Sequence, residues 1–362
     1  MTDSENSEHL TALRSLTAVN GPIDADAPTA TYQREQNYRN GRLTAPRARL
    51  HKQIIREFFA ENDAVIRDRQ VLVMAGPPGA GKSSARRERI PEAEEKHWRF
   101  IDPDDFKTRL LRKLRDSGEY DDIVPPAVKA RIDEGDRFAP GELAALVHEE
   151  SSELAREAAT LSLERGERVV IDGVHGSKVK LLKRFQQLSD QGYTSIEIIA
   201  VDGPREVTRA RVINRWEKGY AAFQDGTDDD AAYQARYVPE HITDSLYEDD
   251  ERFSACTRAV AMAIKGAPEG LTVCADVYYV DDVDAAGAPW RSYRKDDVDG
   301  FAHEKIREIP RPQPRAATDS APSAPAGGDS TTAAAGEIYV AGYERSDGTV
   351  VPPHTRTRPT SS

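Results

Sequence analysis

The chain has 362 residues, of which 38% are hydrophobic and 31% are charged, and its formal net charge at pH 7 is −12. This length leaves room for one domain of about 200 to 250 residues with extensions at its ends. The acidic balance argues against a nucleic-acid partner, because neutralising phosphate chains needs a basic surface. With only two cysteines, the sequence indicates neither a disulfide framework nor a zinc cluster.

The sequence shows no targeting or membrane signal. Its first residues lack the basic and apolar regions of a signal peptide, and no apolar stretch approaches the length of a membrane span. We therefore expect a cytoplasmic protein without a membrane partner.

Residues 1–45 are mostly polar and predict an N-terminal extension. The main domain is expected over residues 46–309. Its first element is a helix within 46–68, where apolar residues recur three and four positions apart. This helix should lead into the strand that follows it and pack beside that strand.

A short apolar run, Val71–Ala75, is followed by the pattern Gly76-x-x-x-x-Gly81-Lys82-Ser83 and then by good helix formers. Strand, glycine loop and helix in this order form the phosphate-binding loop, or Walker A motif. Its backbone N–H groups turn toward a polyphosphate, its lysine neutralises phosphate oxygens, and its serine hydroxyl completes a Mg²⁺ shell. A chance turn before a surface helix is the alternative, which the correct flanks disfavour. The residues predicted to bind ATP are Gly76, Pro77, Pro78, Gly79, Ala80, Gly81, Lys82, Ser83 and Ser84.

Five strand candidates alternate with helical segments across the main domain. The strands are expected at 71–75, 99–102, 168–172, 196–202 and 272–280. The helices between them are expected at 105–114, 140–164, 178–189 and 205–218. This alternation predicts an α/β fold of the P-loop NTPase type, with a mainly parallel five-stranded sheet flanked by helices. Ligands of such sheets bind at the carboxyl ends of the strands.

The C-terminal part differs in composition from the main domain. Residues 310–336 are rich in Pro, Ala, Thr, Ser and Gly and lack aromatic residues, which predicts a disordered linker. Residues 337–362 contain two short strand-like runs around Asp347-Gly348, which predict a small hairpin and a tail.

Carboxylates follow two of the predicted strands. Asp102, Asp104 and Asp105 come directly after the second strand, where a carboxylate can accept a proton from an attacking hydroxyl or hold Mg²⁺. Helix capping is the alternative, and it accounts well for one aspartate. Asp172 ends the third strand and resembles the aspartate of a Walker B motif. The predicted Mg²⁺ ligands are therefore Ser83 and Asp172, acting through water.

Basic residues follow the fourth strand. Kinases clamp the transferring phosphoryl group with arginines, because negative charge develops on its equatorial oxygens. A solvated helix face is the alternative for most of these residues, and spacing alone does not choose among them. They are Arg205, Arg209, Arg211, Arg215, Arg236 and His241.

These motifs together resemble the zeta toxins, the kinases of toxin–antitoxin systems. Beyond the glycine loop, residues 101–107 read Ile-Asp-Pro-Asp-Asp-Phe-Lys, similar to the family's Ile-Asp-x-Asp-x-Phe followed by Lys or Arg. The order and approximate spacing of the motifs agree over about residues 50–245. The other matching segments are 76–83, 166–173, 215–217 and 235–239.

The resemblance implies an ATP- and Mg²⁺-dependent kinase that phosphorylates the 3′-hydroxyl of the amino sugar in UDP-N-acetylglucosamine and so inhibits growth. It implies a nucleotide sugar as the substrate, and it allows a cognate antitoxin as a partner. Carried over by motif position, Lys82 holds phosphates and Asp104 is the general base. Arg215 and Arg236 are then the arginines on the γ-phosphate.

The acceptor side departs most from the family's pattern. The resemblance places Asp102, Asp172 and His175 there, with Glu157 as the nearest match to a sugar-binding glutamate and Glu153 as its rival. Residues 115–140 look like an insertion, and Gly173-Val-His-Gly-Ser replaces the family's Gly-Thr-x-Arg. The lysines that follow could face a pyrophosphate, with a solvated helix face as the alternative; they are Lys178, Lys180 and Lys183.

Two other functional classes stay open at this point. One is a kinase of the same fold that acts on another small-molecule hydroxyl, because such kinases differ mainly in the acceptor pocket. The other is an ATP-dependent binding protein or switch. Turnover of ATP when an acceptor is supplied distinguishes a kinase from a switch.

Overall fold

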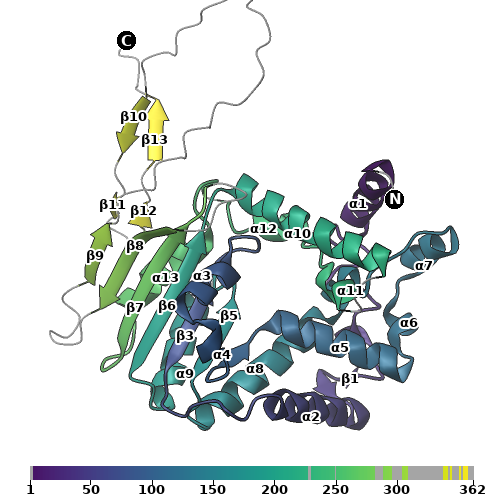
Figure 1. The fold of residues 1–362 in the computed structure, drawn as a ribbon, viewed down its shortest axis with the longest axis horizontal. Helices are drawn as coiled ribbons and strands as arrows, with labels where there is room; N and C mark the ends of the chain where they lie inside the picture. Colours follow the sequence, from purple (N-terminus) through teal and green to yellow (C-terminus); the bar gives the residue numbers. More distant parts are fainter. Residues whose placement is uncertain are drawn as a thin grey trace, which may run out of the picture.

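The computed structural model describes residues 3–226, 230–248 and 250–281. Beyond residue 281 it describes the strands at 288–295, 304–308, 337–340, 343–344, 350–351 and 354–357. A twisted sheet occupies one side of the molecule and a group of helices occupies the other (Figure 1). Of the helices described, none is both long and apolar enough to cross a membrane.

Five parallel strands form the centre of the sheet. They are β3 (Val71–Ala75), β4 (Arg99–Ile101), β5 (Val169–Gly173), β6 (Ser195–Asp202) and β7 (Thr272–Tyr279). Their order is β4-β5-β3-β6-β7, so the strand before the glycine loop is central, and all neighbours among them pair in parallel. The prediction of a mainly parallel five-stranded sheet is confirmed.

Two further strands, β8 (Ala288–Lys295) and β9 (Glu304–Glu308), extend the sheet antiparallel beyond β7. The sequence analysis did not predict them. Their sequences lack the continuous apolar run that identified the central strands, and an antiparallel strand at the edge of a sheet does not need one.

Helices cover both faces of the sheet, so β3 is buried along its whole length. Val71, Val73 and Ala75 pack into the larger core, whereas Leu72 and Met74 point to the opposite face. The longer helices that contribute to the larger core include α2 (Ala45–Ala60), α5 (Pro103–Ser117), α8 (His148–Glu164), α9 (Lys178–Asp190) and α13 (Ala255–Lys265). The opposite face packs against α3 (Lys82–Arg89) and the start of α10 (Arg205–Asp225). The sheet therefore holds the glycine loop between two packed layers.

The helices differ from the expected ones in three places. Helix α2, which was expected within 46–68, ends at Ala60. Beyond it, Ile66 exchanges backbone hydrogen bonds with His97 and Arg168 and so lies in extended chain. The segment expected as one helix at 140–164 is a 3₁₀ helix, η2 (Pro140–Val147), followed by α8. Helix α13 was not predicted.

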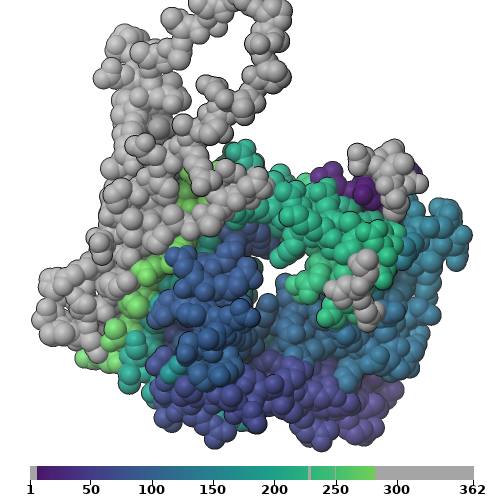
Figure 2. All heavy atoms as spheres, in the orientation of Figure 1, coloured from purple at the N-terminus to yellow at the C-terminus, as the bar shows by residue number. Residues whose placement is uncertain are grey.

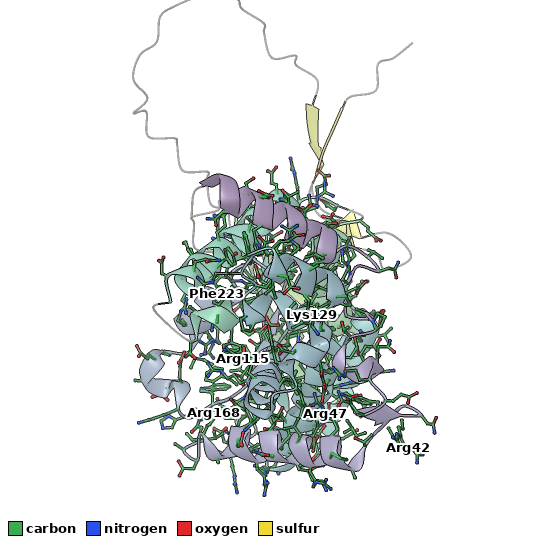
Figure 3. The ribbon with its side chains drawn as sticks, turned by 90° about the vertical axis from the view of Figure 1, so that its right-hand side faces the viewer. Arg42, Arg47, Arg115, Lys129, Arg168 and Phe223 are labelled. Atoms are coloured by element: carbon green, nitrogen blue, oxygen red, sulfur yellow. The ribbon has the colours of Figure 1, made fainter. Side chains whose placement is uncertain are left out.

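Helix α2 is fixed to α8 by a buried ion pair. Arg47, which is 3% exposed, donates from Nη2 to Glu150 Oε2 at 2.7 Å. In Figure 3, Arg47 lies within the molecule, whereas Arg42, before the helix, lies at its periphery. The pair joins the segment before the glycine loop to the helix that precedes β5.

A second, smaller core lies in the helical part of the molecule. Leu13, Ile23 and Ala30, all fully buried, belong to it. The described part of the segment expected as a polar extension therefore packs into the domain. Its elements are α1 (Asp3–Leu16), η1 (Thr31–Gln33), β1 (Tyr38–Arg39) and β2 (Arg42–Leu43). The other helices of this part are α6 (Tyr120–Ile123), α7 (Pro126–Asp133), α11 (Ala231–Gln234) and α12 (Glu240–Asp244).

Near the C-terminus, four short strands pair antiparallel. They are β10 (Glu337–Val340) with β13 (His354–Thr357), and β11 (Tyr343–Glu344) with β12 (Val350–Val351). The expected linker at 310–336 and the expected turn at Asp347-Gly348 lie outside the described residues.

Candidate active site

The glycine loop joins the central strand β3 to α3 and lies against the backbone of neighbouring elements. A Cβ added to Gly76 would lie 2.3 Å from the carbonyl oxygen of Val201, and one on Gly79 would lie 2.2 Å from that of Thr208. Both glycines have positive φ, +150° and +80°. Only glycine fits here, because a side chain would collide with main chain that cannot move aside. The nine residues predicted to bind ATP form this loop and the first turn of α3.

Lys82 lies between the loop and the end of β5. Its Nζ donates to the carbonyl oxygen of Gly76 at 3.0 Å and lies 3.9 Å from Asp172 Oδ1. Ser83, Asp102 and Asp172 line one cavity of about 430 Å³, which extends between α3 and α5. Figure 2 shows the molecule hollowed between these two helices.

These residues fit a Mg²⁺ ion held with a polyphosphate. Among the described residues, no group of three or more His, Cys, Asp or Glu side chains could form a metal cage. Mg²⁺ rarely uses such a cage, because it keeps several waters and binds through one or two carboxylates and the substrate phosphates. A hydroxyl and a carboxylate beside the glycine loop are therefore a sufficient protein contribution.

The three aspartates after β4 have different contacts. Asp102 is the N-cap of α5, and its Oδ1 accepts a hydrogen bond from the N–H of Asp104 at 2.8 Å. Asp105 accepts from Arg109 at 2.8 Å. Asp104, whose side chain is 36% exposed, pairs with Lys107 at 3.0 Å. Of the three, only Asp104 forms an ion pair with a cation from a distant segment of the described chain, Arg236.

Arg236 reaches Asp104 from the segment after α11. Its Nη1 donates to the backbone carbonyl of Asp104 at 3.0 Å, and its Nη2 lies 3.9 Å from Asp104 Oδ2. Its buried Nε has no hydrogen-bond partner among the described residues. Arg215 lies on α10, within the electrostatic reach of Asp102, Asp104 and Arg236. The structure thus brings both predicted arginines to the predicted base.

Of the other basic residues on α10, only Arg211 contacts the glycine loop. Its Nη1 lies 3.4 Å from the carbonyl oxygen of Ala80, and 3.0 Å from the position of a Cβ on Gly81. Arg205 instead pairs with Glu251, and Arg209 with Asp244 at 2.6 Å. The sequence analysis did not assign Arg211 or Lys107 to the site. The spacing of Arg211 one helical turn before Arg215 was the available signal.

The carboxylates of the site shift each other's proton affinity. Burial, together with the charges of Asp104 and Asp172, raises the pKa of Asp102 to about 6. Burial also raises the pKa of Asp172, against the charge of Lys82. At Asp104, burial favours the protonated acid, but Lys107 and Arg236 outweigh it and hold the pKa below its usual range. Asp104 is therefore ionised at neutral pH and able to accept a proton.

A buried carboxylate fixes the loop after β6. Asp202 is fully buried and accepts hydrogen bonds from the N–H of Gly203 at 2.9 Å and from the N–H and hydroxyl of Ser254, each at 3.1 Å. The hydroxyl of Thr257 also donates to it. Burial raises the pKa of Asp202 to about 6. These contacts connect the end of β6, which lies against Gly76, to the start of α13.

The remaining residues predicted on the acceptor side are not gathered at Asp104. Glu157 is exposed and lines a separate surface cavity, together with Glu153, Arg156, Thr160 and Leu161. Glu153 accepts a hydrogen bond from the hydroxyl of Tyr38 at 2.6 Å. The lysines that follow β5 are exposed. They are Lys178, Lys180 and Lys183.

His175 follows β5 in a left-handed conformation, with φ +52°. Its Nε2 is buried without a hydrogen-bond partner among the described residues and lies 2.9 Å from the position of a Cβ on Gly173. Burial, and then the charges of Arg184 and Lys82, lower the pKa of His175 to about 4. The imidazole is therefore neutral and folded back against its own strand.

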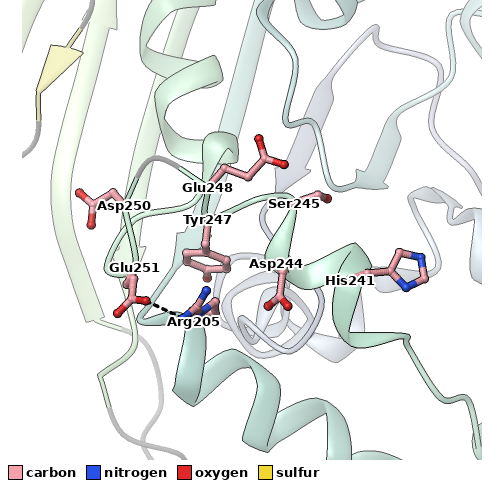
Figure 4. A pocket seen from close by; sticks show the side chains of 8 residues that line it. All are labelled: Arg205, His241, Asp244, Ser245, Tyr247, Glu248, Asp250 and Glu251. Atoms are coloured by element: carbon pink, nitrogen blue, oxygen red, sulfur yellow. Dashed lines mark hydrogen bonds and ion pairs between the residues drawn. The ribbon is translucent and has the colours of Figure 1, made fainter. Parts of the chain in front are cut away.

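A further cavity lies beside α12 and the start of α10 (Figure 4). Arg205 and Glu251 pair across it, and Asp244, Glu248 and Asp250 make its lining acidic. Two of the basic residues that follow the fourth strand, Arg205 and His241, line it. None of the residues assigned to ATP, Mg²⁺ or catalysis does, and its carboxylates would repel a polyphosphate.

A glycine loop at the carboxyl edge of a parallel sheet, faced by carboxylates and by arginines from a neighbouring helix, defines the class of ATP-dependent P-loop kinases. The Zeta toxin family matches residues 62–265, which is more than half of the chain. The chain belongs to the zeta toxin family. Comparison with curated proteins gives no match.

Several solved structures are distantly similar in fold. A chain of the AvrRxo1-ORF1:AvrRxo1-ORF2 complex with sulphate ions has 17% identity and a TM-score of 0.48, covering 69% of this chain and 68% of that one. The AvrRxo1-ORF1:-ORF2 structure with ATP gives 17% identity and 0.48, with coverages of 70% and 68%. A structure of the PezAT chromosomal toxin–antitoxin system of Streptococcus pneumoniae gives 13% and 0.42, with coverages of 70% and 83%.

Proposed function

We propose that the chain transfers the γ-phosphoryl group of ATP, with Mg²⁺, to the 3′-hydroxyl of the amino sugar of UDP-N-acetylglucosamine. The observation that carries this proposal is the position of Asp104, which pairs with Lys107 and Arg236 and lies within the electrostatic reach of Asp172. Membership of the zeta toxin family supports the choice of acceptor. Removal of a cell-wall precursor would then inhibit growth.

In the proposed reaction, the loop amides and Lys82 hold the phosphates of ATP, while Ser83 and Asp172 hold Mg²⁺ through water. Bound Mg²⁺ neutralises charge on the phosphate oxygens. Asp104 accepts the proton of the sugar hydroxyl as its oxygen bonds to the γ-phosphorus, and the bond to the β,γ-bridging oxygen breaks to release ADP. Arg215 and Arg236 stabilise the charge on the three equatorial oxygens.

The low pKa of Asp104 has a consequence for this reaction. A carboxylate held ionised by two cations is a weak base. When Arg236 and Lys107 turn to the incoming phosphate oxygens, their pull on Asp104 weakens and its basicity increases. Binding of ATP and acceptor would thereby change Asp104 from a carboxylate held in ion pairs into a stronger general base.

We further propose that the protein acts in the cytoplasm and that a cognate antitoxin is its partner. Both proposals are supported by the family to which the chain belongs. A partner that covers the cleft between α3 and α5 would block access to Asp104.

Another small-molecule hydroxyl is the second candidate acceptor, because the acceptor side differs from the family's pattern. Glu157 lies outside the cluster around Asp104, and the imidazole of His175 is folded against β5. These observations favour a kinase of the same class that acts on another small-molecule hydroxyl.

A competition assay distinguishes the two candidates. Equimolar UDP-N-acetylglucosamine, UDP-glucose and free N-acetylglucosamine are incubated with ATP and Mg²⁺, and each is followed by the mass of one added phosphate. We expect a clear preference for UDP-N-acetylglucosamine. Phosphorylation of none of the three, with ATP hydrolysis intact, would overturn the proposed acceptor and leave the kinase class standing.

A further inference from the structure

Trp216, the residue after Arg215, is hydrogen-bonded to the buried Glu142. The indole N–H of Trp216 donates to Glu142 Oε1 at 2.8 Å, and the same oxygen lies 2.9 Å from Nε2 of His9. The other carboxylate oxygen, Oε2, accepts from the backbone N–H of Ala139 at 2.9 Å. We call these four residues the Glu142 cluster. Because a carboxylate only accepts, His9 donates from Nε2.

Ala235, the residue before Arg236, packs against Gly141, which is the neighbour of Glu142. A Cβ added to Gly141 would lie 2.8 Å from the carbonyl oxygen of Tyr233 and 3.0 Å from the carbonyl carbon of Ala235. A Cβ on Gly219 of α10 would lie 2.8 Å from the backbone nitrogen of Ala235. The segment that carries Arg236 is therefore held between the start of η2 and α10.

The Glu142 cluster is buried, and two of the three donors to its carboxylate are far from it in sequence. The side chain of Glu142 is fully buried, and that of His9 is 3% exposed. The imidazole of His9 stacks on Tyr220 of α10 with ring centroids 4.5 Å apart. His9 belongs to α1, a helix that contains none of the catalytic motifs. A donor removed from a buried carboxylate leaves that charge short of a partner, so the elements around it must shift.

We propose that His9 is a positioning residue for phosphoryl transfer. Through Glu142, His9 fixes the position of the segment that carries Arg215 relative to the segment that carries Arg236. The N-terminal helix thereby sets the geometry of the active site without contributing a residue to it. This inference rests on the proposed function, in which both arginines act on the transferring group. A displacement of about 1 Å in such groups can cost about 10²-fold in rate.

The test compares His9→Ala with His9→Gln in the full-length protein. Glutamine keeps an N–H donor for Glu142, whereas alanine has none. Val128→Ala is the matched control, because Val128 is fully buried in the same smaller core but has an apolar side chain that cannot hydrogen-bond to Glu142. Transfer to UDP-N-acetylglucosamine and hydrolysis of ATP by water are both measured, because the arginines act on the phosphoryl group whichever oxygen accepts it.

For His9→Ala we expect kcat to fall about 10- to 100-fold, while KM for ATP stays within about twofold, because the glycine loop is untouched. His9→Gln should recover most of this loss, and Val128→Ala should keep kcat near that of the wild type below its melting temperature. Equal kcat in His9→Ala and the wild type, or equal losses in His9→Ala and Val128→Ala, would overturn the inference.

Hydrogen exchange supplies a readout that does not depend on turnover. In His9→Ala, amide protection should fall in two separate segments, 211–220 and 233–238, which carry the two arginines. Loss of protection confined to α1 would contradict the positioning role. If the wild type neither transfers phosphate nor hydrolyses ATP, the proposed function fails, and exchange in these two segments still decides whether His9 orders them.

Discussion

The nucleotide side and the acceptor side of this site are built from different materials. The nucleotide side is made of main chain: glycines packed on the carbonyl oxygens of Val201 and Thr208 turn a loop at the end of the central strand. The proposed acceptor side is made of side chains from α5, α10 and the segment after α11. A main-chain site requires particular residues at fixed spacing, whereas a side-chain site requires only that distant segments meet. The first is therefore visible in a sequence, and the second depends on the whole fold.

The largest effect is expected from Lys82→Ala, on the nucleotide side. Among the described residues, the lysine donates to the loop carbonyls of Gly76 and Pro77 and lies near Asp172, so its loss should remove charge from the phosphates with little change in stability. We expect transfer to fall by about 10³- to 10⁵-fold, the range for a cation on a transferring phosphoryl group. Steady-state rates and melting temperatures measure both effects. Lys96→Ala, at an exposed lysine, is the control, and normal turnover by Lys82→Ala would show that the loop is not the ATP site.

The same contrast explains what the sequence could predict. The five parallel strands were identified because each contains a short, mostly apolar run, and the glycine loop was identified because its spacing is strict. Strands β8 and β9, which extend the sheet beyond β7, carry no such run. The residues of α1 look polar in sequence because only one side of the helix, including His9 and Leu13, is buried.

At the site itself, the position of Asp102, Asp104 and Asp105 after a strand did not separate them, and only the resemblance to the zeta toxins singled out Asp104. The structure separates them by their partners: a helix cap, a pair with Arg109, and a cluster of cations. No spacing rule predicts that Arg236 would return across more than 130 positions to the backbone of Asp104. The role of Glu142 could not be predicted either, because its two side-chain donors, His9 and Trp216, lie 133 positions before it and 74 positions after it.

The next effect in size is expected from Asp104→Asn, which tests the acceptor side. Asparagine keeps the shape but cannot take a proton, so kcat should fall by about 10²- to 10⁴-fold while ATP affinity stays near that of the wild type. Asp105→Asn is the control, because Asp105 has the same helix and charge but pairs with Arg109. Rate measurements with ATP binding by calorimetry would decide. A collapse of ATP binding with a high residual rate would assign Asp104 to Mg²⁺ instead.

The pH dependence of stability at Asp202 tests whether the nucleotide side, although formed by main chain, also depends on a buried side chain. Its pKa of about 6 in the fold lies above the value of an unfolded aspartate, about 3.9. The folded state therefore binds the proton more tightly, and the free energy of unfolding falls as pH rises from about 4 to 6. This decrease should approach about 2 to 3 kcal/mol.

Urea denaturation between pH 4 and 7 measures this effect as the difference between the wild type and Asp202→Asn. Taking the difference removes the contributions of other carboxylates, including Asp102. We expect the stability of the wild type relative to the variant to decrease with rising pH. A difference that does not change with pH would place the proton affinity of Asp202 near its ordinary value.

The smallest effect is expected from Glu157→Gln. Because Glu157 is exposed in a cavity that shares no lining residue with the one lined by Ser83, Asp102 and Asp172, its charge is screened from an acceptor bound beside them. We expect KM for the sugar nucleotide and kcat to stay within about twofold of the wild type. Glu153→Gln, which alters the partner of Tyr38 in the same cavity, is the matched control for a general disturbance of α8. A KM raised about tenfold in Glu157→Gln alone would show that the acceptor extends along the outer face of α8, and the acceptor side would then be larger than the cleft between α3 and α5.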